Sequence, residues 1–150
     1  MYFQCFGFVL NAFKCECYFA GTNTPECFKY RTLDDSTRRI HSKTGKSNYD
    51  NIIVSGWYRF VTGYMMPSRS SSSSGSYCSY SSGYCDTSYH GVLIGSHPSS
   101  GQILYSKVCF GYSGSSCCNY YKYIYVRNCG SFYVYQLKPT CSSCRYCTLY

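Results

Sequence analysis

Apolar and polar side chains alternate along two neighbouring stretches toward the C-terminal end of the chain. In residues 121–127, YKYIYVR, three tyrosines and Arg127 fall on one face, whereas Lys122, Ile124 and Val126 fall on the other. Residues 132–137, FYVYQL, alternate in the same way. The Asn-Cys-Gly-Ser stretch between them is typical of a turn, and period-two patterning around such a turn predicts a β-hairpin.

Two shorter stretches, residues 57–61 and 92–94, combine β-branched and aromatic residues and predict further strands. No stretch keeps a helical period of apolar residues over about eleven positions, so helices should be few and short. Cysteine content adds a second constraint, because 13 cysteines in 150 residues are typical of a chain held by disulfides. The predicted fold class is therefore a small, mainly β, disulfide-rich domain with short antiparallel strands, long loops and few short helices.

The only tryptophan of the chain lies in GWYRF, residues 56–60. This run places three large aromatic side chains close together: Trp57, Tyr58 and Phe60. A buried strand explains such a run most simply, and an exposed binding face is the alternative. We predict that all three side chains belong to the core and that Trp57 is largely buried.

The net charge of +8 indicates affinity for acidic surfaces. The only cluster of basic residues is Arg38, Arg39, His41, Lys43 and Lys46, which is expected to be a solvated loop. No nucleic-acid-binding motif accompanies it, so no nucleic-acid partner is predicted. No run of about 18 apolar residues occurs either, and no transmembrane segment is expected.

Patterns that carry catalysis are missing from the sequence, including the nucleophile elbow, the P-loop and the dinucleotide fingerprint. His41, His90 and His97 are isolated and are expected at turns or on the surface. Cys141, Cys144 and Cys147 could hold a metal, but they lack a fourth ligand at a standard spacing, which favours disulfides. We expect no catalytic residue, no metal site and no cofactor.

Two segments stand apart from the predicted strands. Residues 1–26 form a leader that could be a degenerate signal peptide, a remnant of an EGF-like domain or an artefact of the gene model. Residues 68–85 have the Ser/Tyr/Gly composition of a flexible loop. Because the number of cysteines is odd, one thiol should stay unpaired or form an intermolecular disulfide. Candidates for it lie in the leader: Cys5, Cys15 and Cys17.

The order of motifs between residues 27 and 147 resembles the eight- or ten-cysteine domain of the family of uromodulin, the zymogen-granule membrane glycoprotein and the liver-specific zona-pellucida protein. The motifs that carry the resemblance are Cys27 with Tyr30, GWYRF at 56–60, Met66-Pro67, Cys78, Cys85, Cys109-Phe110, Cys117-Cys118, FYVYQL at 132–137 and Arg145-Tyr146-Cys147. The resemblance implies a secreted, non-enzymatic module of the kind found beside zona-pellucida domains. The pairs that it implies are Cys27–Cys129, Cys78–Cys117, Cys85–Cys147 and Cys109–Cys118.

The chain departs from this family pattern at several places. Tyr49 stands where the family has a cysteine, and this leaves Cys141 and Cys144 to pair with each other. No Asn-x-Ser/Thr glycan acceptor occurs in the sequence. We therefore expect a module that contacts an extracellular protein or glycan without the N-glycans of uromodulin. The alternatives are a Tyr/Ser/Cys-rich matrix or adhesive protein and a small cationic defence protein.

Overall fold

The computed structural model of the chain describes residues 24–68, 82–112 and 118–150. The strands are β1 Arg31–Leu33, β2 Gly56–Phe60, β3 Tyr64–Met65, β4 Tyr89–Leu93, β5 Ile103–Gly111, β6 Tyr120–Asn128, β7 Tyr133–Leu137, β8 Cys144–Tyr146 and β9 Thr148–Leu149. The helices are single 3-10 turns, η1 Pro25–Cys27, η2 Ser36–Arg38 and η3 Tyr84–Asp86. The prediction of a mainly β, disulfide-rich domain is confirmed.

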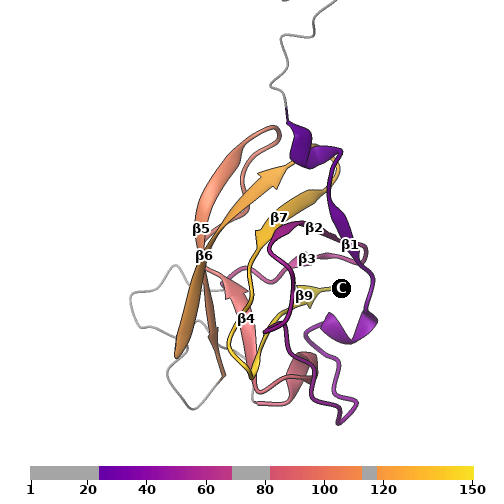
Figure 1. The fold of residues 1–150 in the computed structure, drawn as a ribbon, viewed down its shortest axis with the longest axis vertical. Coiled ribbons are helices and arrows are strands. Elements are labelled where there is room, and N and C mark those ends of the chain that lie inside the picture. Colours follow the sequence, from indigo (N-terminus) through magenta and orange to yellow (C-terminus); the bar gives the residue numbers. More distant parts are fainter. Residues whose placement is uncertain (1–23, 69–81, 113–117) are drawn as a thin grey trace, which may run out of the picture.

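Most strands belong to one seven-stranded sheet with the order β1-β2-β7-β6-β5-β4-β8, and β3 pairs with β9 separately (Figure 1). The central pairs are antiparallel, but β1 runs parallel to β2 and β8 runs parallel to β4. The expectation of antiparallel strands is therefore wrong at both edges of the sheet. Parallel neighbours need a long crossover connection, and long stretches of chain separate β1 from β2 and β4 from β8.

The predicted hairpin is formed by β6 and β7, and this prediction is confirmed. Val126 lies opposite Tyr135 in the antiparallel ladder. At the turn, the Asn128 side-chain oxygen accepts a hydrogen bond from the backbone N–H of Gly130 at 2.8 Å. Gly130 has a φ of 92°, a left-handed conformation that glycine adopts without steric cost. The glycine in the turn therefore fixes the register that the alternation requires.

Two hydrophobic clusters cover opposite faces of the sheet. Consecutive residues of a strand point to opposite faces, and in β4 Leu93 joins the larger cluster while Val92 joins the smaller one. The larger cluster contains Tyr58, Phe60, Met65, Leu93, Val108, Phe110, Ile124, Val126, Tyr135, Leu137, Cys144 and Tyr146. The smaller cluster contains Ile40, Met66, Cys85, Val92 and Cys147.

Trp57 is partly buried but does not belong to either cluster of buried residues. Tyr58 and Phe60 are 5% and 4% exposed, whereas Trp57 is only half-buried. The reason is the two-residue period of β2, which turns Trp57 away from the face on which its neighbours are buried. Trp57 pairs with Gln136 across the ladder between β2 and β7.

Two further expectations about polar residues are wrong. Arg38 was expected in a solvated loop with its basic neighbours, but it is buried at 8% exposure because it pairs with Asp50. His90 was expected at a turn or on the surface, but it is fully buried in β4. This strand lies between β5 and β8, so its residues are inside the sheet.

Candidate functional site

A row of exposed tyrosines covers the outer face of β5 and β6. Tyr105 comes from β5, and Tyr121, Tyr123 and Tyr125 come from β6. Their exposed fractions are 57%, 57%, 43% and 42%. We call these four residues, together with Lys107, the tyrosine face. Isolated exposed apolar residues are ordinary on protein surfaces, but a contiguous group on a rigid sheet indicates an interaction site.

The rings of the tyrosine face contact one another across the two strands. Tyr105 lies opposite Tyr125 in the antiparallel register, with ring centroids 4.7 Å apart. The rings of Tyr105 and Tyr123 are stacked at 5.4 Å, and those of Tyr121 and Tyr123 meet edge to face at 6.0 Å. Lys107 places its Nζ 4.6 Å from the centre of the Tyr121 ring. These contacts hold the rings in an ordered array.

The alternation of β6 explains why the tyrosines face outward. Ile124 and Val126 are fully buried in the larger cluster, so the residues between them must point away from it. Alternation in the sequence groups the β6 tyrosines on one face but gives them no role, and Tyr105 is missed because the pattern predicts no strand there. The apolar and aromatic run at 103–110, ILYSKVCF, is the signal that could have found β5.

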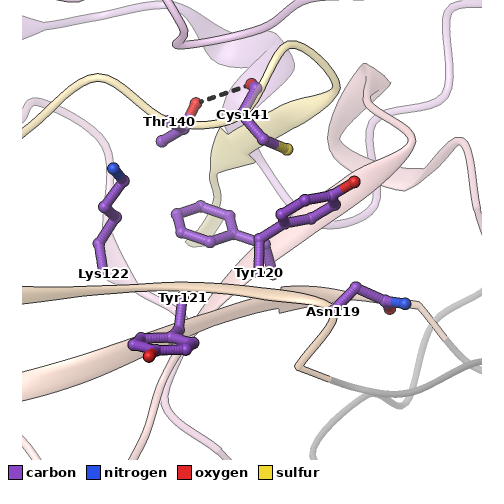
Figure 2. A pocket seen from close by; sticks show the side chains of 7 residues that line it. Asn119, Tyr120, Tyr121, Lys122, Thr140 and Cys141 are labelled. Atoms are coloured by element: carbon purple, nitrogen blue, oxygen red, sulfur yellow. Dashed lines mark hydrogen bonds between the residues drawn. The ribbon is translucent and has the colours of Figure 1, made fainter.

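An open pocket of about 310 Å³ lies at the start of β6, beside the tyrosine face. Figure 2 shows that Tyr120 and Lys122 extend toward Thr140 and Cys141, whereas Tyr121 lies on the opposite side of the strand. The lining residues are Phe110, Asn119, Tyr120, Tyr121, Lys122, Thr140 and Cys141. The pocket therefore combines aromatic rings, one lysine and a disulfide sulfur.

Four disulfides frame the sheet within the described residues. The structure joins Cys27 to Cys129, Cys85 to Cys147, Cys109 to Cys118 and Cys141 to Cys144. Their Cα separations of 5.7, 6.0, 4.7 and 5.0 Å fall within the usual range for disulfides. These pairs agree with the ones that the family resemblance and the substitution at Tyr49 led us to expect.

The other cysteines named in the sequence analysis lie outside the described residues. Cys78 and Cys117 fall in the undescribed segments 69–81 and 113–117, so the bond between them stays a prediction. Cys5, Cys15 and Cys17 lie in residues 1–23 and are likewise not described. Cys118, the neighbour of Cys117, lies just before β6 and bonds to Cys109 in β5.

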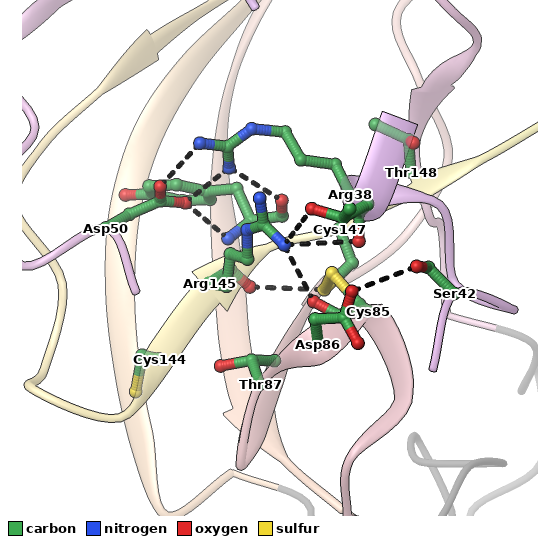
Figure 3. The surroundings of a disulfide bond; sticks show 12 residues. Arg38, Ser42, Asp50, Cys85, Asp86, Thr87, Cys144, Arg145, Cys147 and Thr148 are labelled. Carbon is green, nitrogen blue, oxygen red and sulfur yellow. Dashed lines mark hydrogen bonds and ion pairs between the residues drawn. A yellow bond between two sulfur atoms is a disulfide. The ribbon is translucent and has the colours of Figure 1, made fainter. Parts of the chain in front are cut away.

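A buried ion pair lies beside the Cys85–Cys147 disulfide (Figure 3). Arg38 donates two hydrogen bonds to the Asp50 carboxylate, each 2.7 Å long, and the two side chains are 10% and 4% exposed. Asp50 also accepts from the backbone N–H of Tyr146 at 2.9 Å. Removing one partner of such a pair leaves a buried charge without compensation, which is strongly destabilising.

Arg145 lies beside the Arg38–Asp50 pair, and we call these residues together with Asp35 the polar layer (Figure 3). Its guanidinium donates to the carbonyl oxygens of Thr37 and Cys85 at 3.1 and 3.0 Å and pairs with Asp35. Burial alone would raise the pKa of Asp35, but hydrogen bonds from Thr37 and the Arg145 charge bring it below its usual value. The layer ties η2 and η3 to β8, and its members are too far apart in sequence for a local pattern to reveal them.

Most of the described carboxylates have partners within the fold. Glu26 accepts from Arg127 at 2.6 Å, and Asp86 accepts from Thr44 and Ser42. Burial alone would raise the pKa of Asp86, but these hydrogen bonds bring it below its usual value. With Asp35 and Asp50 paired as well, Asp34 is the one described carboxylate without an internal partner. Most described lysines and arginines have no such partner, so cations dominate the surface.

His97 lies in a cluster of aromatic rings that includes Tyr64 of β3. Its Nε2 is 2.9 Å from the Tyr135 hydroxyl, and its ring lies 4.4 Å from that of Tyr133 and 5.2 Å from that of Tyr64. Burial lowers the pKa of His97 to about 4, so the ring is neutral at pH 7. Its neighbours are aromatic rings, which makes it a packing residue. Within residues 24–68, 82–112 and 118–150, no cluster of three or more His, Cys, Asp or Glu side chains could hold a metal.

Comparison with known proteins places this arrangement in context. Residues 58–148 match the model of the uromodulin-like domain family. Mouse pancreatic secretory granule membrane major glycoprotein GP2 is 32% identical over 130 residues, which cover 81% of this chain and 23% of the mouse protein. The chain thus spans about a quarter of that relative's length. Across the described parts of the chain, helices are too short or too polar to span a bilayer.

Proposed function

Because the chain belongs to the family of uromodulin-like domains, we propose that it is a non-enzymatic contact module that binds an acidic extracellular protein through its tyrosine face. The family and the disulfides make the chain an extracellular, disulfide-rich module. The observation that carries the binding proposal is the ordered group of exposed tyrosines on β5 and β6.

Physical chemistry favours tyrosine for such a surface. Tyrosine is enriched at the centres of protein interfaces, where its ring buries a large area and its hydroxyl finds a hydrogen-bond partner. A side chain loses conformational entropy when it is immobilised on binding. The rings of Tyr105 and Tyr123 are already stacked in the free protein, so they lose less conformational entropy on binding.

The charge distribution supports an acidic partner. The chain carries a net charge of +8, and Asp34 is the one described carboxylate without an internal partner. Lys107 brings a positive charge into the tyrosine face itself. Opposite charge on a partner would accelerate its approach and disfavour basic competitors.

The position of the tyrosine face on the sheet favours a protein over a glycan as its partner. It lies on the broad flank of two long antiparallel strands, which suits a protein surface. The chain itself has no Asn-x-Ser/Thr acceptor, so it should not present N-glycans to a glycan-binding partner.

The absence of catalysis is part of the proposal. His90 is buried in the sheet, and His97 contacts aromatic rings rather than a carboxylate and a nucleophile. The carboxylates Asp35, Asp50 and Asp86 are committed to hydrogen bonds and ion pairs that hold the fold. These arrangements favour structural roles for the residues that usually carry acid–base chemistry.

Two arrays test this proposal. The wild-type module and the double variant Y105S/Y123S are labelled identically and applied to an array of extracellular protein domains and to a glycan array. We expect acidic protein domains to bind the wild type and to lose most of their signal with the double variant. The matched control is Tyr49→Ser, because Tyr49 is also exposed but lies outside the tyrosine face.

The outcomes separate the competing functions. Equal signals for the wild type and the double variant would place the binding surface elsewhere. Signals confined to sulfated or carboxylated glycans, and lost with Y105S/Y123S, would replace the protein partner by a glycan. Insolubility of the oxidised chain unless it is reduced would favour the matrix or adhesive alternative.

A further inference from the structure

We propose that the Cys141–Cys144 disulfide is a site of thiol–disulfide exchange, attacked by an incoming thiolate at the Cys141 sulfur. The two cysteines are separated by two serines, which gives the Cys-x-x-Cys spacing that suits a reversible dithiol. This inference concerns the pocket at the start of β6, which borders the tyrosine face at Tyr121, and it does not rest on the proposed binding function.

The two sulfurs differ in access. Cys144 is fully buried at the start of β8, whereas Cys141 is half-buried and lines the open pocket of about 310 Å³. Figure 2 shows the Cys141 sulfur directed toward Tyr120, inside this pocket. An exchange reaction needs a thiolate to approach one sulfur along the S–S axis, so the pocket selects Cys141 as the attacked atom.

Lys122 supplies a positive charge at the same pocket. Thiolates, and not thiols, carry out the attack, and a nearby cation stabilises them. Of the residues that line the pocket, Lys122 is the one with a full charge, because the others are aromatic rings, an amide, a hydroxyl and Cys141 itself. The pocket therefore favours an anionic thiol such as glutathione over a neutral one.

Hydrogen bonds that do not involve the sulfurs also hold the surrounding backbone. The Cys144 N–H donates to the Cys141 carbonyl at 3.1 Å, which closes the turn independently of the sulfurs. The Cys144 carbonyl accepts from the Asp50 N–H and from the Thr140 hydroxyl, both at 2.9 Å. The reduced cysteines would remain neighbours and could bond again.

Loop size also singles out this disulfide. Its cysteines are 3 positions apart in sequence, compared with 102, 62 and 9 for the other three pairs in the described residues. In the chain-entropy description, the stabilisation from a disulfide grows with the length of the loop that it closes. Among the described disulfides, opening the Cys141–Cys144 bond therefore costs the fold the least.

The chemical step is a two-electron exchange. An incoming thiolate forms a mixed disulfide with the Cys141 sulfur, the S–S bond breaks, and Cys144 leaves as a thiolate that takes up a proton. A second thiolate attacks the sulfur of the bound thiol, releases Cys141, which is protonated, and yields an external disulfide. Two external thiols are oxidised and the protein disulfide is reduced, and the reverse reaction restores it.

Limited reduction of the native chain tests the proposal. Unpaired thiols are first blocked, reduced glutathione is added, and newly freed cysteines are trapped at intervals with a second alkylating reagent. Mass spectrometry of peptides digested without reduction then identifies each opened pair. We expect Cys141 and Cys144 to be labelled while the other three disulfides stay closed, and glutathione to be attached to Cys141.

Two variants sharpen this test. Cys144→Ser, incubated with oxidised glutathione, should accumulate a Cys141–glutathione mixed disulfide. The Cys141 thiolate attacks oxidised glutathione and releases one reduced glutathione, and the variant has no Cys144 thiol to displace the bound one. Lys122→Glu should slow the reaction with glutathione about tenfold at low salt. It should slow the reaction with mercaptoethanol less, because the attacking mercaptoethanol thiolate carries less negative charge than the glutathione thiolate. Lys46→Glu makes the same change of charge on an exposed loop and is the matched control.

Several results would overturn the proposal. Another disulfide that opens first, all pairs opening together, or an adduct on Cys144 would each exclude Cys141 as the exchange site. If Cys144→Ser does not fold, the time course of the wild-type chain alone still decides the order of opening. An equal effect of Lys122→Glu and Lys46→Glu would remove the pocket lysine from the reaction.

Discussion

Tyrosines of the inner and outer faces of one sheet are held in opposite ways. Tyr135 and Tyr146 are 1% and 0% exposed, and each hydroxyl has a backbone partner. The Tyr135 oxygen accepts from the Met65 N–H at 3.1 Å, and the Tyr146 hydroxyl donates to the Lys138 carbonyl at 2.9 Å. Tyr105 and Tyr123 instead contact other exposed rings.

This difference shows that the residue type alone does not tell what a tyrosine does. A buried ring contributes its area to the core, and its hydroxyl must be satisfied, so it specifies a unique packing. An exposed ring leaves both its area and its hydroxyl available to a partner. Burial also raises the pKa of Tyr135 and Tyr146 above that of free tyrosine.

The largest expected change in stability comes from removing a buried ring, and removing an exposed ring is the comparison. Tyr146→Ala should lower the free energy of unfolding by about 3 to 5 kcal/mol, because it leaves a cavity in the larger cluster. Tyr123→Ala should change it by no more than about 0.5 kcal/mol. Denaturant unfolding of the oxidised proteins measures both values. Similar losses for the two variants would abolish the distinction between the faces.

Removing only the hydroxyl tests whether the buried hydrogen bond matters. Tyr135→Phe should lower the free energy of unfolding by about 1 to 3 kcal/mol, because the Met65 N–H loses its acceptor inside the core. Tyr125→Phe, on the exposed face, is the matched control and should have almost no effect. Denaturant unfolding again provides the measurement, and a neutral Tyr135→Phe would mean that water replaces the lost oxygen.

Acid should lower the free energy of unfolding through His97, which packs against Tyr135 on the inner face. Burial holds the pKa of folded His97 at about 4, below the unfolded value of 6.5, so the unfolded state binds the proton more tightly. The His97 contribution is therefore complete above pH 6.5 and is lost as the pH falls toward 4, by about 1 kcal/mol at pH 6.

Unfolding midpoints of the wild type and His97→Gln between about pH 7.5 and pH 5 measure this contribution. The unfolding midpoint of the variant should fall less steeply as the pH is lowered. The fall that remains comes from His90, because burial also lowers the pKa of His90 to about 4. Tyr123→Ala should keep the wild-type slope. Identical slopes for all three proteins would show that His97 is already solvated in the folded state.

The smallest expected effect lies within the tyrosine face. Lys107→Ala should lower the free energy of unfolding by about 0.5 kcal/mol, because an exposed cation–π contact with Tyr121 is lost. Lys46→Ala removes an exposed lysine from the loop outside this face and should have no measurable effect. Equal values for the two lysines would mean that the rings do not hold Lys107.

Local patterns in the sequence predicted the parts of the fold that neighbouring residues determine. The β6–β7 hairpin followed from alternation around a glycine turn, and the family resemblance led to the expected pairs of disulfides. The buried position of Arg38 did not follow, because it depends on Asp50 and on backbone atoms 108 positions away. Non-local contacts of this kind leave no period in the sequence.

The tyrosine face was not predicted as a site, and the sequence groups only some of its residues. Alternation grouped the β6 tyrosines, but the array needs Tyr105 from β5, which only strand pairing brings alongside them. Trp57 is partly buried, on the other face of β2 from Tyr58 and Phe60, because consecutive residues of a strand point to opposite faces. Burial depends on which face a strand presents, and this is decided by the whole sheet.

The excess of cations over carboxylates has a consequence for concentrated solutions of this protein. Identical molecules with a charge of +8 and little exposed negative charge repel one another, which keeps their aromatic flanks from meeting. Salt shortens the range of this repulsion to about 8 Å at roughly 0.15 M. The osmotic second virial coefficient should therefore be positive at low ionic strength and fall as salt is added, so colloidal stability and partner attraction come from the same charges.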